Sequence, residues 1–186
     1  KMNKVLYIIL ISLFSFTIYS CSSSSNTKTT TDNTTTTSSP LFIAVGASGT
    51  LLTSSDGTTW TTQTSGTSNN LRAVAYGNST LVVVGYSGTV LTSTDGTTWT
   101  AQTSGTSDNL SNVTYGNSTF MAVGGSGTIL TSSDGTTWTS KTSGTSENLW
   151  DVAHGNSTWV VNGDNGTIFS SSDGTSWDNR TSASGT

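Results

Sequence analysis

Hydrophobic residues follow two different patterns along this chain. Between Val5 and Tyr19 they form one largely apolar run, whereas beyond residue 20 no apolar run has helical spacing. There they occur in short runs bounded by Gly, Ser, Thr, Asn and Asp, a pattern typical of short strands joined by tight turns. The pattern therefore predicts an N-terminal export segment followed by an all-β domain.

The strand-like runs repeat with a fixed period. The stretch SSDGTTW at residues 54–60 returns as STDGTTW, SSDGTTW and SSDGTSW, so that its tryptophan recurs every 39 residues. This period divides the chain into repeats at residues 42–80, 81–119, 120–158 and 159–186. Periods of this length are typical of solenoids, arrays and propellers.

Each full repeat contains four strand-like runs. One set of four runs covers residues 71–76, 81–85, 89–93 and 99–103, and short Gly-Asn-Ser-Thr, Tyr-Ser-Gly and Asp-Gly connections join its members. Such connections favour antiparallel meanders, and four strands per unit is the content of one propeller blade. We predict an all-β propeller of four-stranded blades, with about four blades present.

The first repeat begins at its second strand, and the last repeat stops after its fourth. One blade is thus a strand short, and an open array would leave unpaired strand edges. We expect the sequence to be a fragment of a longer array. A small four-blade ring, closed by an imperfect blade or by a second chain, is the alternative.

The repeated heptapeptide has the chemistry of a hairpin turn. Asp56 is placed to accept backbone N–H bonds, Gly57 to adopt a positive φ, and Thr59 to add a side-chain bond. Trp60 is expected to pack on a neighbouring strand or blade, which would contribute about 2–3 kcal/mol. The structural set comprises Asp56, Gly57, Trp60, Asp95, Gly96, Trp99, Asp134, Gly135, Trp138, Asp173, Gly174 and Trp177.

This heptapeptide resembles the Asp-box, or BNR repeat, of sialidases and of photosystem II assembly-factor propellers. Here Gly57 directly follows Asp56, so the interval from Asp to Trp is one residue shorter than in the common form. Flanking runs such as FMAVGGSGTILTSSDGTTWTS extend the resemblance, which covers residues 42–181 and includes related bacterial lipoprotein propellers. It implies that the Asp-box is a structural rim turn away from the ligand face, so we expect no metal there. A weak calcium site is the alternative.

The N-terminal residues indicate export and lipid attachment. Lys1 and Lys4 flank the start of the apolar run, which is short for a membrane-spanning helix and stops at Ser20-Cys21. Residues 18–21 resemble a bacterial lipobox, which implies cleavage before Cys21 and acylation of its thiol. We assign residues 1–20 to a signal peptide, 21–40 to the lipidated Cys and a Ser/Thr-rich disordered tether, and 41–186 to the propeller. A retained anchor and a free cysteine are the alternatives.

Charge and cysteine content exclude several functions. Without the signal peptide, the chain has four basic residues against ten acidic ones and no basic cluster, which argues against a nucleic-acid partner. Because Cys21 is the single cysteine, no intramolecular disulfide or cysteine-rich zinc site can form. We expect no cofactor, and a membrane association only through the lipid anchor, at the outer membrane or surface of a bacterial cell.

The sequence lacks the residues that a sialidase active site requires. Such a site needs three arginines, a tyrosine nucleophile with a glutamate partner, and an acidic acid/base. The chain has only Arg72, Arg180 and Glu147, and its single histidine, His154, occupies a slot filled by Tyr76 and Tyr115 in other repeats. A packed ring at a strand end is the expected role of His154, and we expect no enzyme activity.

Differences among the repeats point to a binding face. They cluster after the second strand and early in the first strand, two positions that share one end of a blade, opposite the Asp-box. The candidate binding residues are Arg72, Tyr86, Trp150, Asp151 and Asp164. Neutral drift at exposed positions is the alternative explanation. The sequence thus favours a non-enzymatic envelope lipoprotein that binds a protein or a glycan; a degenerate sialidase-like hydrolase and a repetitive surface adhesin are the alternatives.

Overall fold

A computed structural model describes residues 20–23 and 42–180 of the chain. These residues form four antiparallel sheets, each a meander of four strands. The first sheet contains β1 (Ser20–Ser23), β2 (Phe42–Val45), β3 (Leu51–Ser54) and β4 (Thr61–Thr62). The second contains β5 (Leu71–Gly77), β6 (Thr80–Gly85), β7 (Val90–Ser93) and β8 (Thr100–Gln102). The third contains β9 (Leu110–Gly116), β10 (Thr119–Gly124), β11 (Ile129–Ser132) and β12 (Thr139–Lys141). The fourth contains β13 (Leu149–Gly155), β14 (Thr158–Gly163), β15 (Ile168–Ser171) and β16 (Asp178–Asn179).

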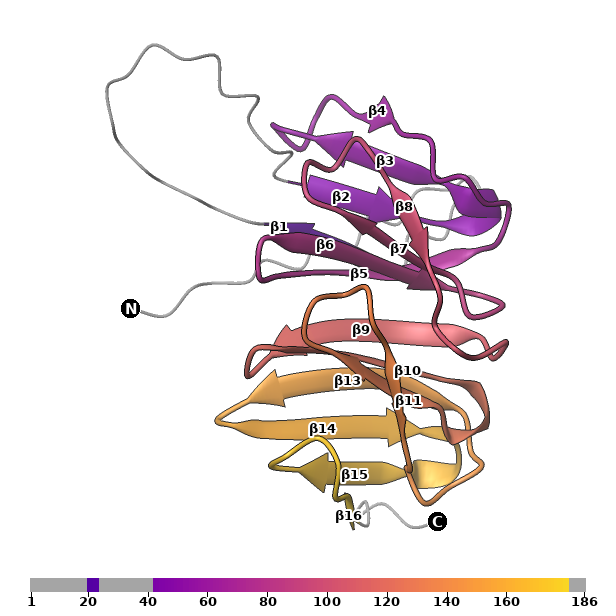
Figure 1. Cartoon of the computed structure of the whole chain (residues 1–186), viewed down its shortest axis with the longest axis vertical. Helices are drawn as coiled ribbons and strands as arrows, with labels where there is room; N and C mark the ends of the chain where they lie inside the picture. The colour runs from indigo at the N-terminus through magenta and orange to yellow at the C-terminus, as the bar shows by residue number, and fades with distance from the viewer. Residues whose placement is uncertain (1–19, 24–41, 181–186) are drawn as a thin grey trace.

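The sheets are stacked face to face in chain order, from the first sheet at the top of Figure 1 to the fourth at the bottom. The first strands of successive sheets contact one another along the stack. The Asp-box turns lie toward the left of the view, and the turns that follow the second strands lie on the right. The sequence prediction of four-stranded antiparallel units is therefore confirmed, with strand ends shifted by one or two residues. Within the described ranges, no helix has the length and apolar character needed to cross a membrane.

Connections within a sheet follow the expected turn chemistry. Asn78 and Ser79 both have positive φ, at 45° and 59°, as a two-residue hairpin turn of the mirror-image type requires. The turns after the second strands of the first, third and fourth sheets contain short 3-10 segments: η1 (Ala47–Gly49), η2 (Gly125–Gly127) and η3 (Asp164–Gly166). Corresponding turns therefore lie on the same side in every sheet: the turns after the first and third strands on one side, and the turn after the second strand on the other.

The first sheet takes its first strand from farther back in the chain than the other sheets do. β1 pairs with β2, with Ser23 opposite Phe42 and Cys21 opposite Ala44. Because the first repeat starts at its second strand, β2 would otherwise expose an unpaired edge, to which another strand can add. Residues 24–40 of the expected tether and residues 1–19 of the expected signal peptide lie outside the described residues.

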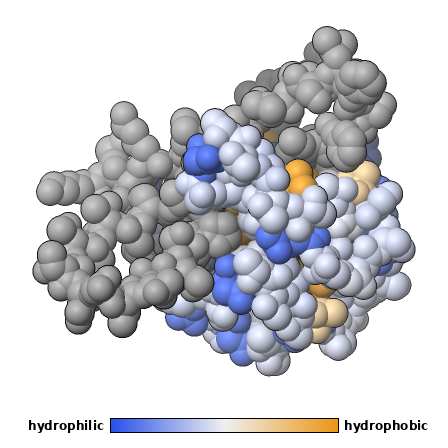
Figure 2. Space-filling view, turned by 90° about the horizontal axis from the view of Figure 1, so that it is seen from above, coloured by the Kyte–Doolittle hydropathy of each residue, from blue (hydrophilic) through white to orange (hydrophobic). Residues whose placement is uncertain are grey.

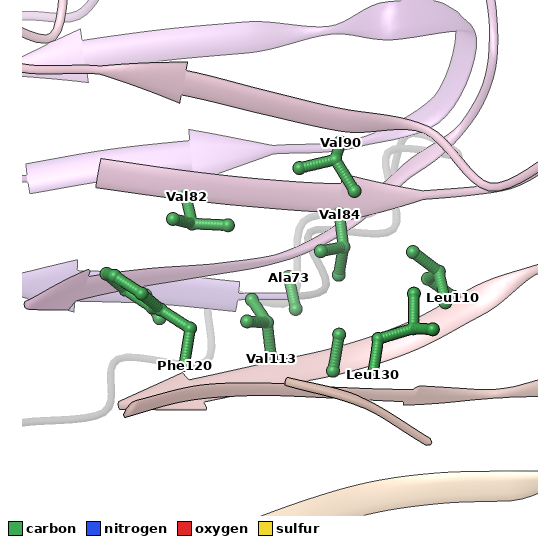
Figure 3. Close-up of a cluster of buried hydrophobic side chains, with 10 residues drawn as sticks. Ala73, Val82, Val84, Val90, Leu110, Val113, Phe120 and Leu130 are labelled. Carbon is green, nitrogen blue, oxygen red and sulfur yellow. The ribbon is translucent and has the colours of Figure 1, made fainter. Parts of the chain in front are cut away.

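Three hydrophobic cores lie between the sheets, one at each junction. The junction of the second and third sheets contains Ala73, Ala75, Val82, Val84, Val90, Leu110, Val113, Phe120, Ala122 and Leu130. Figure 3 shows side chains of β5–β7 pointing toward those of the third sheet across this junction. The junction of the first and second sheets contains Val45 and Val83, and the junction of the third and fourth sheets contains Met121 and Val161.

The strands within the stack are apolar on both faces. Val82 and Val84 belong to the core shared with the third sheet, whereas Val83 between them belongs to the core shared with the first. Successive side chains of a strand point to opposite faces, so the continuous run Leu81–Val84 serves two junctions at once. Seen from above the first sheet, the described surface is mostly pale or blue, with isolated hydrophobic residues (Figure 2).

The Asp-box turns are closed by their own side chains. In the first repeat, Asp56 Oδ1 accepts bonds from the backbone N–H groups of Thr58 and Thr59, both at 2.8 Å. Ser54 Oγ donates to the same carboxylate oxygen at 3.0 Å and accepts the Gly57 N–H at 2.8 Å. Equivalent bonds recur around Asp95, Asp134 and Asp173. Thr59 thus contributes its backbone N–H rather than the expected side-chain bond.

Asp-box tryptophans join each sheet to the preceding one. Trp99, Trp138 and Trp177 are half-buried, and each packs against the core that its sheet shares with the sheet before it. Trp60 of the first sheet is 37% exposed and packs against none of the three cores. No described sheet lies on that side of the first sheet, and the indole keeps only its bond to Gly57 O.

His154 fills a strand-end position in the same stack. Its ring lies 4.5 Å from that of Trp159, as the Tyr115 ring lies 4.6 Å from that of Phe120. A Cβ placed on Gly116 would lie 2.3 Å from His154 Cγ, so only glycine fits beneath this ring. The expected role of His154 as a packed ring is confirmed.

Two tryptophan substitutions test this account of the stack. Trp138→Ala removes a ring that packs between two sheets and should lower the free energy of unfolding by about 3–4 kcal/mol. Trp60→Ala removes the same ring from the same turn at an exposed site and should cost less than about 1 kcal/mol. Denaturant unfolding in dilute solution measures both. Equal losses would contradict the assignment of the interior rings to the sheet junctions.

Candidate functional site

The most variable position of the first strand lies at a β-bulge in three sheets. In the second sheet Leu71 pairs with Gly85 and Ala73 with Val84, so Arg72 is an extra residue without a partner position. The same register shift makes Ser111 and Trp150 the extra residues of β9 and β13. Bulges re-aim side chains and are common beside functional sites. The sequence identified these positions by their variation but gave no sign of the bulge.

The second variable position begins the turn after the second strand. The backbone N–H groups of Tyr86, Gly125 and Asp164 donate to the carbonyls of Asn70, Asn109 and Asn148, each at 2.9 Å. Those asparagines directly precede the strands that carry the bulges. The bond therefore fixes each turn residue beside its bulge residue, at the end of the sheet opposite the Asp-box. We call the six residues Arg72, Ser111, Trp150, Tyr86, Gly125 and Asp164 the variable face.

Residues of the variable face contact each other in pairs within a sheet. In the second sheet, the Arg72 guanidinium carbon lies 5.5 Å from the centre of the Tyr86 ring, within cation–π range. In the fourth sheet, Trp150 Nε1 donates to Asp164 Oδ1 at 2.6 Å, and Asn148 donates to the other carboxylate oxygen at 2.9 Å. The two positions have therefore changed together, from a cation with an aromatic ring to an aromatic ring with an anion.

The third sheet separates these two pairs with small side chains. Ser111 and Gly125 occupy the bulge and turn positions there, and no side-chain contact links them. Trp150 is 47% exposed, far more than the buried aromatic rings of the cores. The variable face thus presents bulky, chemically distinct side chains on the second and fourth sheets. Only the small residues Ser111 and Gly125 lie at these positions on the third sheet between them.

Asp151 has a different role from the paired residues. Its carboxylate accepts a bond from Asn112 Nδ2 of the third sheet and one from the Val152 N–H at 2.9 Å. Asn112 occupies the equivalent position one repeat earlier, so the bond joins neighbouring sheets. The structure places Asp151 next to Trp150 in β13 but not in the pair that Trp150 forms with Asp164.

Two further acidic residues lie at this end of the sheets. Asp108 accepts a bond from Thr128 Oγ1 at 2.9 Å, and Glu147 accepts one from Asn165 Nδ2 at 2.9 Å. Each joins a loop between sheets to the turn that follows a second strand. Asn69 is the counterpart of these two residues in the first repeat. The proximity of this loop position to the turn depends on the three-dimensional fold.

The Asp-box carboxyl groups do not have the properties of a catalytic acid. Backbone N–H bonds from Thr59 and then Thr58 hold the pKa of Asp56 far below its usual range. The pKa values of Asp95, Asp134 and Asp173 are lowered by the same pair of backbone bonds. A general acid must instead hold its proton near the working pH. Each of these carboxylates accepts hydrogen bonds within its own turn, at the end of the sheet opposite the variable face.

The residues considered for hydrolase chemistry lie apart. Arg180 pairs with Asp178 at 3.1 Å, Arg72 lies in the second sheet, and Glu147 bonds Asn165. Among residues 42–180, no group of three or more His, Cys, Asp or Glu side chains is arranged to hold a metal ion. The described geometry therefore assembles neither the arginine clamp nor the nucleophile of a sialidase.

Four-stranded meanders that stack face to face, with their first strands adjacent, define a β-propeller, of which the described residues form four blades. No family model and no curated protein matches the chain. Among solved structures, "YCF48 bound to D1 peptide" aligns with a TM-score of 0.60 at 21% identity over 76% of this chain and 50% of that one. "YCF48 from Cyanidioschyzon merolae" aligns with a TM-score of 0.60 at 18% identity over 78% and 55%.

The likeness to Ycf48 is one of fold. The chain spans about half the length of these solved structures and forms a partial propeller of the same kind. The sequence-based resemblance to assembly-factor propellers is thus confirmed at the level of the fold.

Proposed function

We propose that this protein is a non-enzymatic binding scaffold whose variable face holds a segment of another protein. The observation that carries this proposal is the pairing at the bulges, where Arg72–Tyr86 and Trp150–Asp164 occupy equivalent places on a constant framework. Drift at independent exposed sites gives no reason for two positions to change together into new contacting pairs. One solved structure with this fold is that of YCF48 bound to D1 peptide, which supports a protein ligand.

The chemistry of the variable face favours a particular kind of segment. At the fourth blade, the exposed indole of Trp150 lies beside the carboxylate of Asp164, an arrangement that suits a lysine or arginine side chain. At the second blade, Arg72 over Tyr86 suits an acidic or aromatic group. An extended peptide crossing the small residues Ser111 and Gly125 would meet both. We therefore infer a ligand segment with a basic side chain at its Trp150 end.

A peptide-binding assay tests this function. Binding of an array of extended peptides that differ in charge should favour those with a basic residue. Trp150→Ala should weaken that binding at least about tenfold, with the melting temperature nearly unchanged because Trp150 is exposed. Tyr76→Ala is the matched control, since Tyr76 is an exposed ring near the opposite end of β5 and should leave binding unchanged.

Three outcomes would count against the proposal. Binding that survives in Trp150→Ala would place the ligand elsewhere. Trp150-dependent binding to glycans but not to peptides would replace the protein ligand by a glycan. A peptide or glycan recovered in cleaved form would contradict the non-enzymatic role.

We also propose that the protein is a lipoprotein of the bacterial cell envelope. The support is the order of Lys4, the apolar run and Ser20-Cys21 in the sequence. Because β1 includes Cys21, acylation there would attach the lipid to the first blade itself.

Mass spectrometry of membrane-extracted protein tests this localisation. The expected N-terminus is a lipid-modified Cys21, and Cys21→Ser should abolish processing and lipid labelling. Unmodified protein that retains residues 1–20 in the soluble fraction would contradict the assignment.

A further inference from the structure

The third blade has no large side chain at either of its positions on the variable face. Gly125 begins the turn after its second strand, and Ser111 is its half-buried bulge residue. At the place of Gly125 the other blades have Ala47, Tyr86 and Asp164. The third blade packs on described blades on both sides, so this difference belongs to an interior blade of the stack.

Neither the packing nor the backbone conformation requires glycine at this place. A Cβ placed on Gly125 would lie 3.5 Å from Asn148 Oδ1, which is an ordinary van der Waals contact. On the preceding residue, Gly124, a Cβ would lie 2.2 Å from Asn109 O, so only glycine fits there. Gly125 also lacks the positive φ that favours glycine. Because glycine loses more backbone freedom on folding than alanine does, its presence here indicates a role other than folding.

The neighbouring blades carry large side chains on either side of this place. On the second blade, the Arg72 guanidinium lies over the Tyr86 ring. On the fourth blade, Asp164 accepts bonds from Trp150 Nε1 and Asn148 Nδ2, one on each carboxylate oxygen, which fix the carboxylate beside the indole. A ligand that contacts both pairs therefore has to cross the third blade at its two small residues.

The separation of the two pairs sets the length of such a ligand. Packed sheets lie about 10 Å apart, so the second and fourth blades are separated by about 20 Å. An extended peptide rises about 3.3 Å per residue and covers this distance in about six residues. Its main chain would pass Gly125 and Ser111. The Ser111 hydroxyl hydrogen-bonds to no other described residue and can donate to a peptide carbonyl.

We propose that the third blade is a main-chain subsite, across which an extended peptide runs between the two side-chain pairs with its backbone against Gly125 and Ser111. The peptide has a basic side chain for the pair on the fourth blade and, about six residues away, an acidic one for the pair on the second. Gly125 is then a specificity-determining residue, because a side chain there would take the space of the ligand's main chain. This inference rests on the proposed function and extends it to the length and charge pattern of the ligand.

Fluorescence anisotropy with the full chain in detergent micelles tests the span between the pairs. The probes are labelled Gly/Ser peptides with one Lys and one Asp placed two, four, six or eight residues apart, made in both orders. The peptide with a separation of six should bind at least about tenfold more tightly than the peptide with a separation of two, which reaches only one pair. Equal binding at every separation would overturn the proposal.

Three variants test the subsite itself with the peptide that binds most tightly. Gly125→Tyr gives the third blade the turn residue of the second and should weaken binding at least about tenfold. Gly125→Ala adds one methyl group and should weaken binding less. Ala47→Tyr adds the same ring to the same turn of the first blade, outside the span, and is the matched control with binding at the level of the parent chain. Melting temperatures near that of the parent would show that the three variants fold.

The outcomes separate this inference from the proposed function. Peptide binding that Trp150→Ala weakens but Gly125→Tyr leaves unchanged would overturn the third-blade subsite while the binding scaffold stands. A parent chain that binds none of the Lys/Asp peptides would overturn the inference as well. A parent chain that also binds no member of the wider peptide array would overturn the proposed function with it.

Discussion

Packing between successive sheets is the interaction on which the rest of this structure depends. A single four-stranded meander of this size cannot bury both of its apolar faces, and the second strands of the second and third blades are apolar on both sides. The Asp-boxes of the second, third and fourth blades each add a tryptophan to the junction with the preceding blade, while the carboxylate closes the turn that holds the ring in place. The repeated heptapeptide is thus a device for joining blades as well as for closing a hairpin.

The same packing explains why the variable face can differ between blades. Bulge and turn residues lie at the end of each sheet opposite the Asp-box, where the carbonyls of Asn70, Asn109 and Asn148 accept bonds from the backbone N–H groups of the turn residues. Substitution there costs the cores little. The Arg72–Tyr86 pair on one blade can therefore differ from the Trp150–Asp164 pair on another without changing the junctions between blades.

Much of the fold could be predicted from the sequence, because a 39-residue repeat carries its own turn chemistry and strand pattern. The strands of the second sheet, the Asp-box turns and the packed ring of His154 followed from local residues. The pairing of Ser20–Ser23 with β2 did not, since it joins segments far apart in the chain and leaves no local pattern. The bulges were also missed, because a register shift depends on two strands together, and with them the contact between bulge and turn residues.

Native-state hydrogen exchange of the intact chain tests most directly whether the blades stabilise one another through their junctions. If they do, the amides of β6 and β10, which have a blade on either side, should be protected most strongly, and those of β14 should exchange sooner despite its similar sequence. Equal protection of the second strands in all of the second, third and fourth blades would contradict this account, because each sheet would then be stable on its own.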